Sequence, residues 1–196
     1  AVWIWIVLSS HAWAQFPLHL GGLTLGEDIS EYGELVRMDT CREMSRTPYL
    51  AEGEITPRQG FRSGMISYGV CDRPNKILKI KLKFEDDSKS FFKELMDAYT
   101  EKFGPPGEYK GDPFQTMVIW KWSFVNAEGE RISLILQHNK MVEEEKKGTA
   151  VKMALTTQID KEKACYLKVQ NKRVAPAADQ GKTLSNKEMW DLFIPR

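Results

Sequence analysis

The sequence has few of the side chains from which catalytic and metal-binding sites are built. Three of its 196 residues are histidines, and neither His19 nor His138 has a cysteine or a second histidine nearby at the spacing of metal ligands. It contains no glycine-rich phosphate loop, no G-x-S-x-G turn and no H-E-x-x-H zinc motif. We therefore expect neither a cofactor nor a bound metal. The sequence favours a protein that is not an enzyme, although a Cys165 nucleophile paired with His138 stays open.

An excess of charge of one sign is also lacking. The 28 lysines and arginines almost balance the 27 aspartates and glutamates, which leaves a formal net charge of +1. A dedicated nucleic-acid-binding protein normally has a strong basic excess, so we expect no nucleic-acid partner. With 42% hydrophobic and 28% charged residues, the composition is typical of a folded soluble domain.

Long hydrophobic runs are absent, and the one short run lies at the start of the sequence. Residues 2–8 are apolar, which is far fewer than the roughly 20 residues that span a bilayer. Polar residues follow, and then Ala12 and Ala14 place small side chains two positions apart, as at the cleavage site of a secretory signal peptide. We expect residues 1–14 to be removed near Ala14–Gln15. The protein would then be periplasmic or secreted, with no stable membrane span after cleavage.

Cysteine is scarce as well, with Cys41, Cys71 and Cys165 the only three. Export to an oxidising compartment favours a disulfide, and an odd number leaves one thiol unpaired. Cys41 and Cys71 are closest in sequence and each lies near a turn-like segment, so we predict that they pair and that Cys165 is free. Closing that loop would stabilise the fold by about 3–4 kcal/mol. The alternative, three unpaired cysteines, stays open.

The hydrophobic pattern predicts an α+β fold. Residues 88–103 carry apolar side chains at helical spacing, and Gly104 and two prolines end the helix. Residues 76–84 alternate between apolar and lysine side chains, as in a strand with one face on a core. Further strands are predicted near residue 49 and over residues 61–70, 116–125, 131–138 and 149–159, and a short helix over residues 29–37.

These elements predict one antiparallel sheet of about six strands, with one long and one short helix packed on one face. Their order suggests two repeats, each a helix followed by three strands. We assign residues 15–170 to this single domain and the polar residues 171–184 to a linker. Residues 185–196 form a short apolar tail, and its short tether favours docking of the tail on its own domain. The alternative is that Trp190 and Phe193 contact a partner.

Two further patterns carry candidate binding residues. Lys79, Lys81 and Lys83 form a row that could meet an anionic glycan, a lipid headgroup or a protein, but lysines also keep the solvent face of a sheet soluble, and the sequence favours that interpretation. A second row, on one strand, is formed by large apolar side chains and could offer an aromatic platform to a ligand. The sequence favours a core strand here. The members of this row are Val118, Trp120, Trp122 and Phe124.

Residues 91–106 read F-F-x-x-L-x-x-x-Y-x-x-x-F-G-P-P and precede a hairpin that contains W-x-W, and residues 25–29 read L-G-E-D-I ahead of the short helix. This arrangement resembles small exported bacterial domains of the β-lactamase-inhibitor-like and outer-membrane-assembly lipoprotein type. The resemblance covers about half of the chain and implies a scaffold for protein contacts. We therefore expect an exported, non-catalytic binding or scaffold domain that contacts a protein or an envelope component. The alternative is a secreted or periplasmic hydrolase whose motif is not recognisable.

Overall fold

A computed structural model describes residues 16–140 and 148–174 of the chain. The predicted signal peptide and its cleavage site, most of the predicted linker, and the apolar tail with Trp190 and Phe193 lie outside the described residues. Those predictions stay untested. Among the described residues, no helix is both long enough and apolar enough to cross a membrane.

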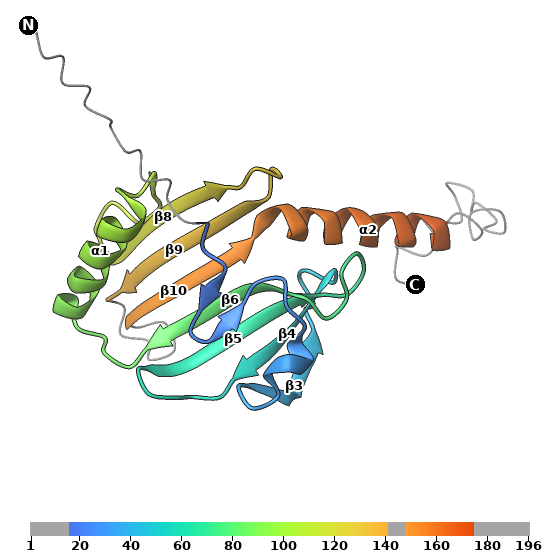
Figure 1. Cartoon of the computed structure of the whole chain (residues 1–196), viewed down its shortest axis with the longest axis horizontal. Coiled ribbons are helices and arrows are strands. Elements are labelled where there is room, and N and C mark those ends of the chain that lie inside the picture. Colours follow the sequence, from blue (N-terminus) through green and yellow to red (C-terminus); the bar gives the residue numbers. More distant parts are fainter. Residues whose placement is uncertain (1–15, 141–147, 175–196) are drawn as a thin grey trace, which may run out of the picture.

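The described residues form a mixed α+β fold around one large antiparallel sheet (Figure 1). From one edge to the other, the eight strands are β3 (Val36–Glu43), β4 (Leu50–Ile55), β5 (Phe61–Gly69), β6 (Ile77–Phe84), β10 (Gly148–Leu155), β9 (Arg131–Asn139), β8 (Met117–Val125) and β7 (Glu108–Tyr109). A small hairpin pairs β1 (His19–Leu20) with β2 (Leu23–Thr24). The helices are the 3₁₀ turn η1 (Ile29–Tyr32), α1 (Lys89–Phe103) and α2 (Thr156–Val174).

The sheet consists of two halves that follow the same path. Each half begins with a helix, η1 or α1, and continues as four strands that pair in sequence order. The last strand of each half, β6 or β10, pairs with the other in the middle of the sheet. The antiparallel α+β class is therefore confirmed, but the sheet has eight strands where about six were predicted, and each half has four strands instead of three.

The two strands that the sequence did not predict lie at the two edges of the sheet. β3 is largely exposed, and its register with β4 shifts between Arg37 and Arg42, so its sequence has no clear alternation. Part of β3 was assigned to the short helix, which is only the four-residue turn η1. β7 has two residues, which is too short for any hydrophobic pattern.

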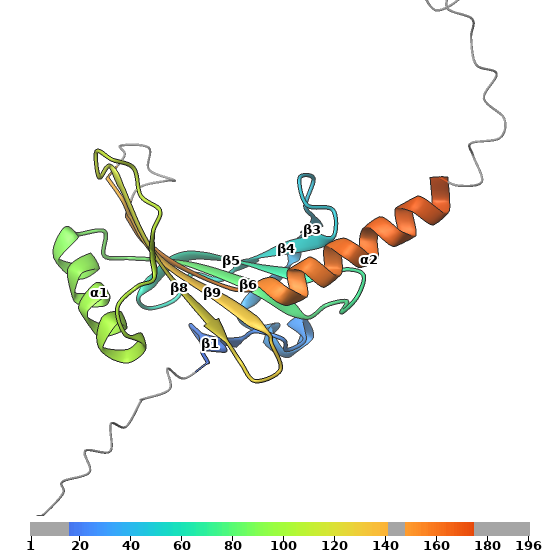
Figure 2. The same cartoon turned by 90° about the horizontal axis from the view of Figure 1, so that it is seen from above.

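One face of the sheet forms the core, and α1 and η1 cover it together, as predicted (Figure 2). Ile80 and Leu82 of β6 are buried there with Ile29 of η1, and the apolar side of α1 packs against the same cluster. The ends of α1 follow the sequence. The Ser88 hydroxyl accepts a hydrogen bond from the Phe91 backbone N–H at 3.2 Å, and Gly104 adopts φ 78° where the helix ends.

The segment after residue 155 differs from the prediction. The strand predicted over residues 149–159 ends at Leu155, and the long helix α2 follows directly and continues to Val174, past the predicted domain end at residue 170. The two fully buried large side chains of α2, Gln158 and Glu162, are polar, so its sequence has no apolar stripe that would predict a helix. In Figure 1, α2 extends away from the end of the sheet.

The disulfide also differs from the prediction, because the structure pairs Cys71 with Cys165 and leaves Cys41 free. The predicted Cys41–Cys71 bridge and the free Cys165 are therefore wrong. Cys71 follows β5 in the loop to β6, and Cys165 is on α2, with 5.9 Å between their Cα atoms although they are 94 positions apart. Cys41 lies on the edge strand β3, and its sulfur occupies the space that a Cβ atom at Gly53 of β4 would need.

Next to the disulfide, the Glu162 side chain fixes α2 to the same loop. Its carboxylate accepts hydrogen bonds from the backbone N–H groups of Val70, Cys71, Asp72 and Arg73, at 3.2, 2.8, 3.0 and 2.6 Å. These four groups converge on two oxygens that are completely buried. The loop between β5 and β6 therefore forms a backbone cradle for one carboxylate of α2.

Candidate anion-binding face

The alternation of β6 separates its apolar side chains from its lysines. Ile80 and Leu82 are buried in the core, so Lys79, Lys81 and Lys83 extend from the opposite face of the sheet. Neighbouring lysines in this row are about 6.7 Å apart along the strand, twice the rise per residue. The predicted row therefore exists, on the face of the sheet that α1 and η1 do not cover.

A fourth lysine joins this row from the neighbouring strand. Lys152 of β10 lies directly opposite Lys81 of β6 in the antiparallel register. Ala150 and Ala154, the residues two positions before and after Lys152, lie opposite the other two lysines of the row. The lysine cluster, as we call this group, consists of Lys79, Lys81, Lys83 and Lys152. Sequence reasoning missed Lys152, whose only signal is that it is the one charged residue in β10.

The lysine cluster is electrostatically unfavourable in the protein alone. Like charges that lie directly opposite each other on two strands destabilise a sheet. Burial, together with repulsion from Lys81 and Lys79, lowers the pKa of Lys152 from 10.5 to about 8. Burial and repulsion from Lys79 lower the pKa of Lys81 in the same way. Both side chains are only partly exposed, so water compensates their charge incompletely.

Two acidic side chains of β4 on this face belong to other ion pairs. Glu54 of β4 pairs with Arg37 of β3 at 3.0 Å, and Glu52 pairs with Arg42 at 2.8 Å. Within residues 16–140 and 148–174, no carboxylate forms an ion pair with Lys79, Lys81 or Lys152. Among the described residues, no carboxylate thus neutralises the charges of Lys79, Lys81 and Lys152.

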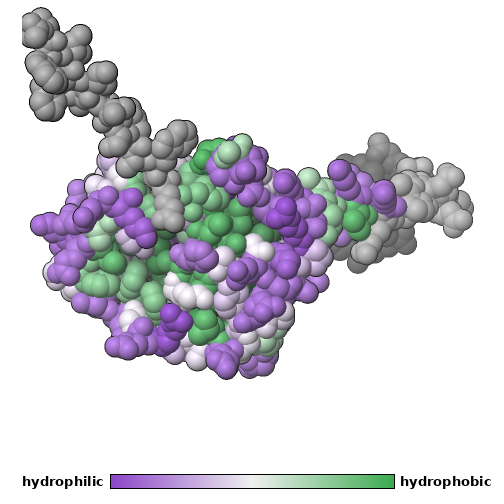
Figure 3. Space-filling view, in the orientation of Figure 1, coloured by the Kyte–Doolittle hydropathy of each residue, from purple (hydrophilic) through white to green (hydrophobic). Residues whose placement is uncertain are grey.

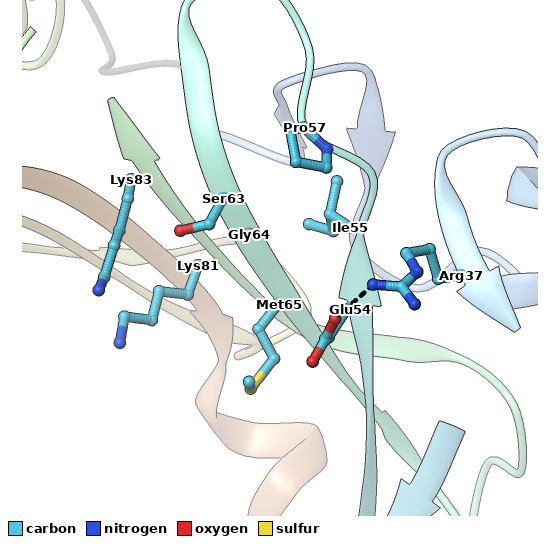
Figure 4. A pocket seen from close by; sticks show the side chains of 9 residues that line it. All are labelled: Arg37, Glu54, Ile55, Pro57, Ser63, Gly64, Met65, Lys81 and Lys83. Atoms are coloured by element: carbon cyan, nitrogen blue, oxygen red, sulfur yellow. Dashed lines mark hydrogen bonds and ion pairs between the residues drawn. The ribbon is translucent and has the colours of Figure 1, made fainter. Parts of the chain in front are cut away.

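A shallow pocket of about 310 Å³ lies beside the cluster, between β4, β5 and β6. Ser63 and Met65 line its floor next to Lys81 and Lys83. Figure 4 shows these two lysines side by side, both extending away from Glu54, whose carboxylate faces Arg37. The polar lining of the pocket thus consists of the Lys81 and Lys83 ammonium groups, the Ser63 hydroxyl and the ion pair of Arg37 with Glu54.

The lysines of β6 lie in the middle of the sheet and not at its edge. β6 pairs with β5 on one side and β10 on the other, so it is a central strand of the sheet. Lysines protect the exposed edges of sheets from pairing with other chains, and that role does not apply to a strand in the middle. Protection of a sheet edge therefore does not explain the lysines of β6.

The apolar row of β8 divides into two parts. Trp122 and Phe124 are buried, and their rings contact Tyr99 and Phe103 of α1 at 5.8 and 5.4 Å between centroids. The Trp122 indole N–H also donates to the Gly104 carbonyl at 2.8 Å. The core interpretation is confirmed for these two residues. Val118 and Trp120, closer to the start of the strand, remain partly exposed.

The open catalytic pair is not assembled. Cys165 is in the disulfide, so it has no thiol, and His138 is buried against Phe92 with its Nδ1 atom 3.0 Å from the Thr149 hydroxyl oxygen. Burial, with repulsion from Lys140, lowers the pKa of His138. Within the described ranges, no group of three or more histidine, cysteine, aspartate or glutamate side chains could hold a metal ion.

Comparison with known proteins finds no matching family model, no matching curated protein and no matching solved structure. The resemblance to β-lactamase-inhibitor-like and outer-membrane-assembly domains stays a prediction that rests on sequence pattern.

Proposed function

We propose that the chain is an exported, non-catalytic binding domain whose lysine cluster holds anionic groups of a protein or an envelope component. The observation that carries this proposal is the position of Lys152 directly opposite Lys81 in the centre of the sheet, with no acidic partner for either among the described residues. A solvated sheet face would not need to concentrate charge of one sign at its middle.

The physical argument is that an anionic ligand removes a cost that the free protein carries. A bound anion offsets the repulsion between Lys81 and Lys152 and favours the charged form of both, so it raises the pKa of Lys152 from about 8. By linkage, the complex then binds more protons than the free protein, and binding weakens as the pH rises above that value. The near-neutral net charge leaves recognition to this local group rather than to a long-range field.

Export is part of the same proposal. The support is the signal-like pattern at residues 1–14 together with the disulfide between Cys71 and Cys165, which is compatible with an oxidising compartment. Amino-terminal sequencing of the protein recovered from outside the cytoplasm should find Gln15 at or near the start. If the exported protein still contains residues 2–8, the predicted cleavage near Gln15 does not take place.

The binding experiment compares two double variants that remove the same charge. Lys81→Gln with Lys152→Gln changes the cluster, and Lys161→Gln with Lys163→Gln changes two exposed lysines of α2. Binding of poly-glutamate, heparin and phosphatidylglycerol vesicles is measured by titration at physiological salt. We expect at least one probe to bind, and its affinity to fall at least tenfold in the cluster variant and by less than twofold in the α2 variant. Failure of all three probes, or equal losses in both variants, would refute the proposal.

A further inference from the structure

A second surface lies on the other side of the sheet, where α1 passes over the start of β8. Val118 and Trp120 extend from β8 toward this helix, beyond the buried part of the core, and Tyr109 of β7 lies against Trp120 with 4.8 Å between ring centroids. Phe92 and Met96 of α1 form the opposite wall of a groove of about 510 Å³. We call these five residues the aromatic groove. Figure 3 shows apolar side chains gathered at the α1 end of the molecule, bordered by hydrophilic ones.

The rim of the aromatic groove is basic. Lys89 and Lys93 lie four positions apart on α1, so they occupy the same side of the helix, and both are exposed. Both line the groove, and no acidic side chain of residues 16–140 or 148–174 does. An apolar ligand that also carries negative charge would therefore match this site in both respects.

A highly exposed apolar residue lies in the loop next to the groove. Phe114 is 88% exposed, and Gln115, the next residue, lines the groove. The Asp112 carboxylate fixes the loop, because it accepts hydrogen bonds from the Phe114 N–H at 2.9 Å, the Thr116 N–H at 3.2 Å and the Thr116 hydroxyl at 2.8 Å. A large apolar side chain held in water by such a loop is typical of a contact residue in a protein interface.

We propose that the aromatic groove binds a segment of a partner protein that inserts an aromatic or large aliphatic side chain and places acidic side chains beside Lys89 and Lys93. The volume falls within the range of about 300–1,000 Å³ of typical binding pockets. Tyr109 is 41% exposed, so the groove is open to water along one side. A lipid chain needs enclosure along its length, whereas a peptide needs only its anchor side chains to be buried. Openness therefore favours a peptide.

This site goes beyond the lysine cluster and does not depend on it. Trp120 faces the α1 side of the sheet, whereas Lys81 and Lys152 face the opposite side. The partner chemistry also differs, because the cluster requires only negative charge, whereas the groove requires an apolar anchor as well.

The test selects ligands from a displayed library of random twelve-residue peptides against the full chain. We expect the enriched peptides to combine an aromatic or large aliphatic residue with at least two acidic residues. Synthetic copies are then titrated by fluorescence anisotropy against Lys89→Glu with Lys93→Glu, against Phe114→Ser, and against a control with Lys161→Glu and Lys163→Glu. All these side chains are exposed, so folding should be preserved, and circular dichroism verifies it.

We expect the dissociation constant to rise at least tenfold in the Lys89/Lys93 variant, at least threefold in Phe114→Ser and less than twofold in the control. The Lys81→Gln and Lys152→Gln variant should bind these peptides as the unchanged protein does. No enrichment, enriched peptides without acidic residues, or equal losses in the rim variant and the control would overturn the proposal. Peptides that lose binding only when Lys81 and Lys152 are changed would also overturn it, while supporting the lysine cluster as the anion site.

Discussion

Replacement of Glu162 by glutamine tests how α2 is held to the sheet. The variant keeps the size of the side chain but replaces one acceptor oxygen by an NH₂ donor. Three backbone N–H groups bond to one carboxylate oxygen of Glu162, and the Arg73 N–H bonds to the other at 2.6 Å. The amide can retain the three bonds by placing its oxygen there. Its NH₂ group then faces the Arg73 N–H, and two donors oppose each other in a buried site.

The magnitude follows from what is lost. Hydrogen bonds to charged groups contribute about 1.5–3 kcal/mol each, and a buried donor without an acceptor costs about 1–3 kcal/mol. One lost bond together with the weakening of three others gives a decrease of about 2–4 kcal/mol in the free energy of unfolding for Glu162→Gln. Glu101→Gln on α1 is the matched control. This exposed side chain should change stability by less than about 0.5 kcal/mol.

The assay is urea denaturation followed by circular dichroism, with the Cys71–Cys165 disulfide intact in all proteins. If Glu162→Gln and Glu101→Gln are equally stable, the cradle of backbone N–H groups does not stabilise the folded chain and the reasoning fails. A lower stability with an unchanged denaturant slope would show that the loss lies in the folded state.

Three further predictions use the same measurements. Trp122→Ala should lower the free energy of unfolding by about 3–5 kcal/mol, and an unchanged melting temperature would contradict its place in the core. Mass spectrometry of the unreduced protein should find Cys71 linked to Cys165. Thiol titration under denaturing conditions should find one free thiol, at Cys41. Reduction of the disulfide should lower the free energy of unfolding by about 4–5 kcal/mol. The pKa of Lys152 is about 8 in the folded protein and 10.5 ordinarily. At pH values between these two, the folded state binds fewer protons than the unfolded state, so the free energy of unfolding should rise with pH. Lys152→Met should reduce that rise, leaving the part that comes from the lowered pKa of Lys81, and should stabilise the protein at pH 7. An undiminished rise in the variant would assign it to another group.

The sequence predicts a helix or strand of this fold where apolar side chains along one side of the element pack against the core. α1, β6 and the hairpin of β8 and β9 were predicted correctly because their apolar side chains all meet one core. β3 is exposed on most of its length, so its residues carry no such pattern. α2 was missed for a different reason, since its buried side chains, Gln158 and Glu162, are held by hydrogen bonds to a distant loop rather than by apolar contact.

The candidate site shows the same limit. The row of Lys79, Lys81 and Lys83 follows from alternation within one strand, and the sequence contains it in full. Lys152 becomes its neighbour only through the pairing of β10 with β6, between residues about 70 positions apart, a pairing that depends on the register of the whole sheet. The disulfide is similar, because proximity in sequence favoured Cys41 for Cys71, whereas the path of α2 brings Cys165 there.

The lysine cluster lies at the junction between the two halves of the sheet, and this location explains how the fold tolerates it. On one face of the junction, Val151 and Met153 of β10 lie opposite Leu82 and Ile80 of β6, and all four side chains are buried. Burial of each contributes roughly 1.5–3 kcal/mol, which outweighs the repulsion between two partly solvated lysines on the opposite face. The core therefore fixes the register, and the register forces Lys81 and Lys152 together. Because strand pairing holds Lys81 and Lys152 together at a cost to stability, a bound anion would stabilise the protein most at this position.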